Sequence, residues 1–183
     1  LATKDIMSQT NNGMNYQTFG SVYLSFPGHQ NYTDYYRDLN IENATASVKY
    51  TVNGITYTRE ILAAFSDQVI TVNMFMNSPF DKTKTLTEDN QIALSGTTST
   101  YEKQKGRIKF QGRIFAKNNG GNKSVKNGII SIENANEVTL YISIATNFKD
   151  YKTLTKDQEE KSKAYLDKAI TKDFKTIKKS HID

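Results

Sequence analysis

Residues 47–65 read SVKYTVNGITYTREILAAF, and apolar or aromatic residues alternate with polar ones on both sides of an Asn-Gly pair. Alternation with a period of two is typical of a half-buried β-strand. Asn53 and Gly54 readily adopt the positive φ angles that a type I′ turn requires. The stretch therefore predicts a β-hairpin whose simplest register sets Val52 opposite Ile55.

The same register sets Tyr50 opposite Tyr57. Further segments with the pattern of a strand precede and follow this hairpin. The other segments that alternate like strands are residues 21–26, 68–76, 91–96, 107–116, 129–133 and 137–145. Gly112 interrupts the fourth of these segments and suggests a β-bulge. About seven or eight short strands separated by turn residues favour a mainly β, antiparallel sandwich over a fold built from βαβ units.

After residue 150 the apolar period changes from that of a strand to that of a helix. Residues 155–158 (TKDQ) fit a capping box, and Glu159 lies four residues before Lys163, the spacing of a helical ion pair. The apolar stripe consists of Leu166, Ile170, Phe174 and Ile177, flanked by Tyr165 and Ala169. This pattern predicts one C-terminal amphipathic helix, with a break near Thr171, that packs on the sandwich or on a following domain.

Composition narrows the functional classes. The chain has 183 residues, a net charge of +5 and no cysteine, so disulfides, thiolate metal sites and a cysteine nucleophile are excluded. No run approaches the roughly 20 apolar residues of a membrane-spanning helix. Lysines dispersed among acidic residues favour a solvated surface over a nucleic-acid-binding face. Residues 1–15 are polar and aperiodic, which indicates a loop or linker.

The chain offers little material for catalysis. His29 and His181 are the only histidines, too few for a histidine-based triad or metal cluster. Carboxylates that a glycoside hydrolase could use occur at Asp34, Asp38, Glu42 and Glu60. Arg37 precedes Asp38 and Arg59 precedes Glu60, so ion pairs between neighbouring strands are the stronger interpretation. We therefore expect no catalytic residue, no cofactor and no metal in this chain.

One loop-like segment could contact a sugar. Residues 29–36 read HQNYTDYY, and tyrosine faces with amide or carboxylate edges suit the apolar and hydroxyl sides of a sugar ring. The expected contacts are His29, Tyr32 and Tyr35. Tyrosine occurs 11 times in the chain, so an ordinary surface cluster is the alternative interpretation.

Several segments together resemble the N-terminal domain of α-L-fucosidases of glycoside hydrolase family 95. They are residues 16–26 (YQTFGSVYLSF), 36–44 (YRDLNIENA), 54–61 (GITYTREI), 67–70 (DQVI), 145–148 (ATNF) and 181–183 (HID). Their order and spacing agree with that family. Two departures concern subfamily and substrate: Ser21 stands where the family often has Asp, and Arg37-Asp38 replaces the commoner Arg-Glu.

The resemblance implies an antiparallel β-super-sandwich of the galactose-mutarotase-like type that precedes an (α/α)6 barrel. The domains would be a linker at 1–15, an incomplete sandwich at 16–150 and a linker helix at 151–183. The parent would be an inverting fucosidase, periplasmic or secreted, whereas this chain alone would be inactive. Its partners would be the absent barrel of the same polypeptide and a fucosylated oligosaccharide.

Three alternatives remain open from the sequence. The chain could be a free-standing carbohydrate-binding module, which would need an exposed aromatic platform. It could be the same domain of another α/α-barrel enzyme, such as an α-galactosidase or a disaccharide phosphorylase. A structural or adhesive protein without sugar contact is the third.

Overall fold

The computed structural model describes residues 19–74, 86–88, 90–98, 100 and 103–183. Its strands are β1 Thr33–Asn40, β2 Thr45–Val52, β3 Ile55–Ala64, β4 Val69–Met74, β5 Leu86–Glu88, β6 Gln91–Thr97, β7 Lys109–Asn119, β8 Asn122–Lys126, β9 Ile129–Glu133 and β10 Glu137–Thr146. Its helices are α2 Gln158–Ile170 and α3 Phe174–Ile182. All strand pairs are antiparallel, so the predicted mainly β class is confirmed.

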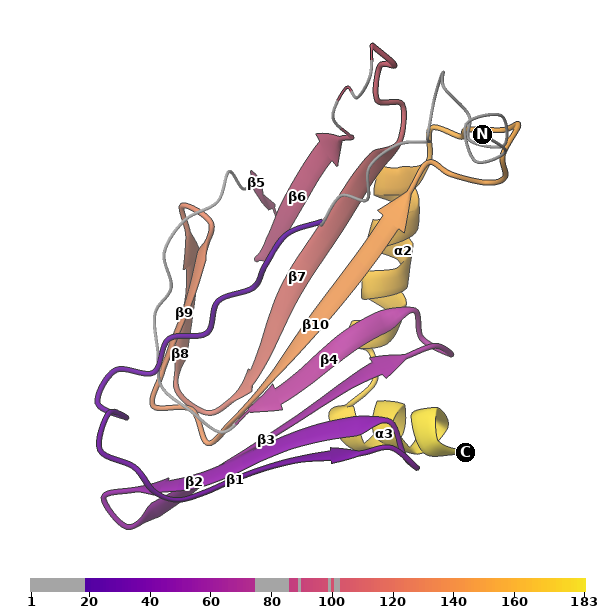
Figure 1. The fold of residues 1–183 in the computed structure, drawn as a ribbon. Coiled ribbons are helices and arrows are strands. Elements are labelled where there is room, and N and C mark those ends of the chain that lie inside the picture. The colour runs from indigo at the N-terminus through magenta and orange to yellow at the C-terminus, as the bar shows by residue number, and fades with distance from the viewer. Residues whose placement is uncertain (1–18, 75–85, 89, 99, 101–102) are drawn as a thin grey trace, which may run out of the picture.

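The strands form one large sheet and one small one. Eight strands follow the order β1-β2-β3-β4-β10-β7-β6-β5, and β8 pairs with β9 separately. Figure 1 shows both helices behind the large sheet, while the chain that leads into β1 crosses in front of it. The helices and the β8–β9 hairpin thus cover opposite faces of the large sheet, which buries apolar side chains on both.

The central hairpin forms as the sequence predicts. Val52 pairs with Ile55, and Asn53 and Gly54 have φ angles of 50° and 78°. Both angles are positive, as a type I′ turn requires, so the two residues connect β2 to β3 without a longer loop.

Two strand predictions need correction. Residues 21–26 form no strand, although Leu24 and Phe26 pack against the core, because their backbone does not join a described ladder. Gly112 marks no bulge, since its pairing with both neighbouring strands runs without a register shift. A side chain at Gly112 would overlap the ring of Phe19, so this glycine makes room for an aromatic residue that lies on the sheet.

The C-terminal region contains two helices where one was predicted. The break falls between Ile170 and Phe174, close to Thr171, as the sequence suggested. The capping box is wrong because the hydroxyl of Thr155 donates to the carbonyl of Asn147 (3.1 Å) and does not cap the helix. None of the described helices is long and apolar enough to cross a membrane.

The predicted helical ion pair is also wrong. Lys163 pairs with Asp167 at 2.6 Å and not with Glu159, which lies in the first turn of α2. An acidic residue there is favourable without a lysine partner, because the helix dipole stabilises negative charge at that end.

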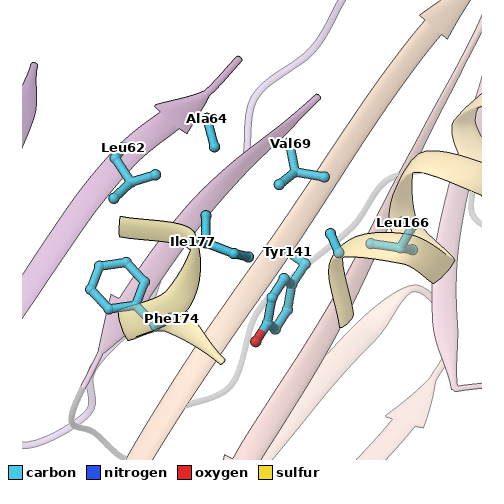
Figure 2. Packing of buried hydrophobic residues seen from close by; sticks show 8 residues of the cluster. Leu62, Ala64, Val69, Tyr141, Leu166, Phe174 and Ile177 are labelled. Carbon is cyan, nitrogen blue, oxygen red and sulfur yellow. The ribbon is translucent and has the colours of Figure 1, made fainter. Parts of the chain in front are cut away.

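Both helices pack on the sheet. The apolar core between the helices and the large sheet comprises Leu62, Ala64, Val69, Tyr141, Leu166, Ala169, Phe174 and Ile177. Figure 2 shows Phe174 and Ile177 near Leu62, with Leu166 on the other side of Tyr141. The Tyr141 hydroxyl donates to the carbonyl of Lys172 (2.9 Å), and Lys172 forms an ion pair with buried Asp67. The apolar stripe therefore covers this sandwich, and a domain boundary at residue 150 stays a prediction.

Candidate functional site

The three residues predicted to contact a sugar lie in one aromatic cluster on the face of the sheet opposite the helices. We call it the Arg59 cluster; its members are Phe26, His29, Tyr32, Tyr35, Tyr50, Tyr57 and Arg59. The rings of His29 and Tyr57 have centroids 4.4 Å apart, and those of Tyr32 and Tyr35 are 5.5 Å apart. The cluster runs from exposed tyrosines at the sheet edge to Phe26 at the core.

The segment that carries Tyr35 is a strand and not the expected loop. β1 pairs with β2, and the register shifts between Thr33 and Tyr36. Between these two pairs, Asp34 and Tyr35 of β1 lie opposite one residue of β2, Tyr50, which defines a β-bulge. Asp34 lies at the bulge with φ 54°. The bulge puts Tyr32 and Tyr35 on the same face of the sheet, although they are three positions apart, a spacing that would put them on opposite faces of a regular strand.

Hydrogen bonds fix the inner part of the cluster. The Tyr50 hydroxyl lies 2.8 Å from Nδ1 of His29 and accepts a hydrogen bond from the Arg59 guanidinium. Burial raises the pKa of Tyr50, whereas burial and then the charge of Arg59 lower the pKa of His29. His29 is therefore biased toward its neutral form, which suits a ring packed among aromatic side chains.

Arg59 contacts aromatic rings, and it forms no ion pair with a carboxylate of the described residues. Its guanidinium carbon lies 3.7 Å from the centroid of Phe26 and 4.9 Å from that of Tyr50. Its Nε is buried without a hydrogen-bond partner among the described residues, and burial lowers the pKa of Arg59. Cation-π attraction and the Tyr50 hydroxyl thus stabilise this charge.

Two of the candidate carboxylates, Glu60 and Asp38, have partners of their own. Glu60 forms an ion pair with Lys178 of α3, so it joins the sheet to a helix instead of joining two strands. Asp38 accepts a hydrogen bond from the Tyr36 hydroxyl at 3.4 Å, and His181 lies 3.0 Å from the carbonyl of Asn43. Across the described ranges no group of three metal-ligating side chains occurs.

Replacing Tyr50 with Phe is expected to destabilise the chain by about 1–2 kcal/mol. The change leaves Arg59 and His29 without the hydroxyl that both contact, and a lost hydrogen bond to a charged group has a cost of this order. Urea unfolding followed by circular dichroism measures it. Tyr57→Phe is the control, because its hydroxyl has no hydrogen bond to the described residues, and an equal loss in both variants would contradict the assigned role.

Sequence reasoning missed four members of the cluster. Phe26, Tyr50, Tyr57 and Arg59 were assigned to strands or ion pairs. The hairpin register contained the signal for three of them, because it sets Tyr50 opposite Tyr57 and leaves Arg59 on the same face two residues later. The sequence did not show that residues 26–32 fold back over that face.

The fold and the sequence of this chain resemble those of N-terminal domains of glycosyl hydrolases. The fold resembles that of a solved structure described as "Putative kojibiose phosphorylase from human microbiome", with a TM-score of 0.57 and 13% identity over 81% of this chain and 22% of that chain. Together with the family match below, this likeness of fold defines a β-domain of the kind found at the N-terminus of family 65 glycosyl hydrolases. The family model "Glycosyl hydrolase family 65, N-terminal domain" matches residues 1–151, and the chain belongs to this family.

A curated relative adds a second enzyme type. The chain is 28% identical over 179 residues to Alpha-L-fucosidase 2 of Arabidopsis thaliana, a match that covers 79% of this chain and 21% of the relative. The chain thus spans about a fifth of the length of each protein. Membership of family 95, expected from the sequence motifs, stays a prediction.

Proposed function

We propose that the chain is the N-terminal domain of an inverting α-L-fucosidase. In this role it supports an (α/α)6 catalytic barrel and forms one wall of the carbohydrate cleft. The observation that carries the proposal is the match to Alpha-L-fucosidase 2, which extends over most of the chain. The ion pair between Glu60 and Lys178 agrees with a structural role for this carboxylate, because it joins the sheet to α3.

The chain by itself is expected to show no hydrolysis of aryl α-L-fucosides, whereas the longer polypeptide that carries it releases fucose. Glu60→Gln is the control variant, because Glu60 directly follows Arg59 of the cluster. A sensitive fluorogenic assay measures both proteins. Turnover by the chain that disappears in Glu60→Gln would contradict a supporting role.

A disaccharide phosphorylase is the second candidate, favoured by the structural similarity to the kojibiose phosphorylase. Phosphorolysis consumes inorganic phosphate and releases a sugar 1-phosphate, whereas hydrolysis consumes water and releases two free sugars. Product analysis of the longer polypeptide with kojibiose and with a fucoside, each with and without phosphate, separates the two. Phosphate-dependent cleavage of kojibiose would replace the fucosidase assignment.

A further inference from the structure

The bulge at Asp34 changes which side chains of β1 are exposed and leaves most of the pairing between β1 and β2 regular. Pairing between β1 and β2 is regular from Tyr36↔Lys49 to Asn40↔Thr45, so the hairpin core does not need the extra residue. Asp34 is exposed, and its carboxylate accepts a hydrogen bond from the neighbouring Thr33 hydroxyl (3.0 Å). A positive φ at a residue other than glycine has an energetic cost, and such residues cluster at functional sites.

The bulge brings together two outward-facing rings. Tyr32 and Tyr35, which we call the tyrosine platform, are 53% and 52% exposed, and their ring planes are inclined at 51°. Neither hydroxyl has a hydrogen-bond partner within the described part of the chain. The platform therefore presents apolar ring faces beside free polar groups, the combination that recognises a sugar ring.

Buried Tyr50 of the Arg59 cluster packs beneath the tyrosine platform and supports it. The ring of Tyr32 lies against that of Tyr50 (6.0 Å between centroids), and Tyr50 is 5% exposed. Arg59 and His29 contact the Tyr50 hydroxyl and hold its ring in place. A rigid base lowers the conformational entropy lost when a ligand is bound.

The charges beside the platform favour a neutral ligand. Asp34 carries a negative charge at the bulge, and Arg37 carries a positive charge on the same strand two residues after Tyr35. Both are exposed and can bond sugar hydroxyls, whereas their opposite charges do not select an anion.

We propose that the tyrosine platform is a binding site for one neutral sugar ring of a fucosylated oligosaccharide. The apolar face of the ring stacks on Tyr32 and Tyr35, and its hydroxyls bond the side chains of Asp34 and Arg37. The ligand class rests on the proposed fucosidase function, whereas the site itself rests on the bulge and the two exposed rings.

Titration of the chain with fucosyllactose, followed by NMR, tests the site, with lactose as the ligand control. We expect saturable binding with a dissociation constant of about 1 mM, because two half-exposed rings supply most of the contact. Tyr32→Ala and Tyr35→Ala should each weaken binding about fivefold or more. Tyr36→Ala is the matched control, since Tyr36 is 60% exposed on the same strand but lies on the other face.

Two changes at Asp34 test whether the two rings, and not the carboxylate, supply most of the contact with the sugar. Asp34→Gly keeps the bulge, because glycine adopts positive φ without strain, and should weaken binding about threefold or less. Deletion of Asp34 removes the extra residue and leaves Tyr32 and Tyr35 two positions apart, the spacing that puts both side chains on one face of a regular strand, so binding should also weaken about threefold or less. Loss of saturable binding in Asp34→Gly, in which both rings remain, would overturn the proposal that the two rings supply most of the contact.

The results of these titrations test the sugar site separately from the proposed fucosidase function. Absence of saturable binding, or equal weakening by Tyr36→Ala and Tyr35→Ala, overturns the platform and leaves the fucosidase assignment to the hydrolysis assay. If the platform binds kojibiose in preference to fucosyllactose, the platform is a sugar site. This result contradicts a preference for fucosylated sugars and argues against the fucosidase assignment. Platform-dependent binding of fucosyllactose supports both.

Discussion

Removal of residues 152–183 is expected to abolish cooperative unfolding of the β-sheet. The deletion takes away α2 and α3 and uncovers Leu62, Val69 and Tyr141, which are at most 4% exposed beneath them. Each large apolar side chain contributes about 1.5–3 kcal/mol when buried, so losing several approaches the whole stability of a domain, about 5–15 kcal/mol. Circular dichroism during heating and binding of a hydrophobic dye measure the effect.

Point variants serve as controls for this deletion. Ile177 is fully buried, so Ile177→Asp should destabilise the chain by about 3–5 kcal/mol, whereas Lys175→Asp on the exposed side of α3 should have little effect. If the shortened chain unfolds cooperatively at the original midpoint, residues 151–183 are a separable linker, as the sequence predicts.

Replacing Gln111 with Leu is expected to destabilise the chain by about 3 kcal/mol. Oε1 of Gln111 accepts hydrogen bonds from Nε of Arg113 (2.8 Å) and from the hydroxyl of Ser162 in α2 (2.7 Å). Arg113 is 7% exposed and forms no ion pair with a described carboxylate. Leucine has a similar volume but leaves this buried charge with fewer partners, which costs more than losing a neutral hydrogen bond. Urea unfolding measures the difference.

Gln111→Glu is the matched variant. A carboxylate still accepts from Arg113 and Ser162, and its hydrogen bond to the guanidinium is charge-assisted. It loses the donor to the hydroxyl of Ser95, which is exposed and can bond water. We expect Glu to be about 2 kcal/mol less destabilising than Leu. Equal losses would mean that the volume of the side chain matters here and its polarity does not.

The fold was predictable wherever local chemistry sets the geometry. Asn53 and Gly54 determine both the turn and the register of β2 with β3, because few residue pairs tolerate two positive φ angles. Leu166 and Ile177 recur at helical spacing, and both are fully buried. In each case a pattern of neighbouring residues contained the information.

Predictions failed where a contact distant in sequence determines the structure. The Thr155 hydroxyl bonds the carbonyl of Asn147 instead of capping α2. Gly112 faces the ring of Phe19, which no local pattern could have indicated. β1 was missed because the bulge at Asp34 interrupts its alternation, so that residues 29–36 read as a loop.

The candidate site was predictable only in its outer part. Tyr32 and Tyr35 stood out as an aromatic run, and the structure brings both to one face together with His29. Arg59 did not stand out, because an arginine beside Glu60 is normally interpreted as half of an ion pair. Its contacts with Phe26 and Tyr50 depend on tertiary folding.

The position of β1 at one end of the large sheet has a consequence for solution behaviour. An end strand offers backbone donors and acceptors to other extended chains, which is a common route to aggregation. The bulge at Asp34 interrupts the row of free backbone donors and acceptors near the start of β1. The charged side chains of Arg37 and Asp38 oppose removal of water from the same strand. The residue that distorts the strand would thus also help to keep concentrated protein dispersed.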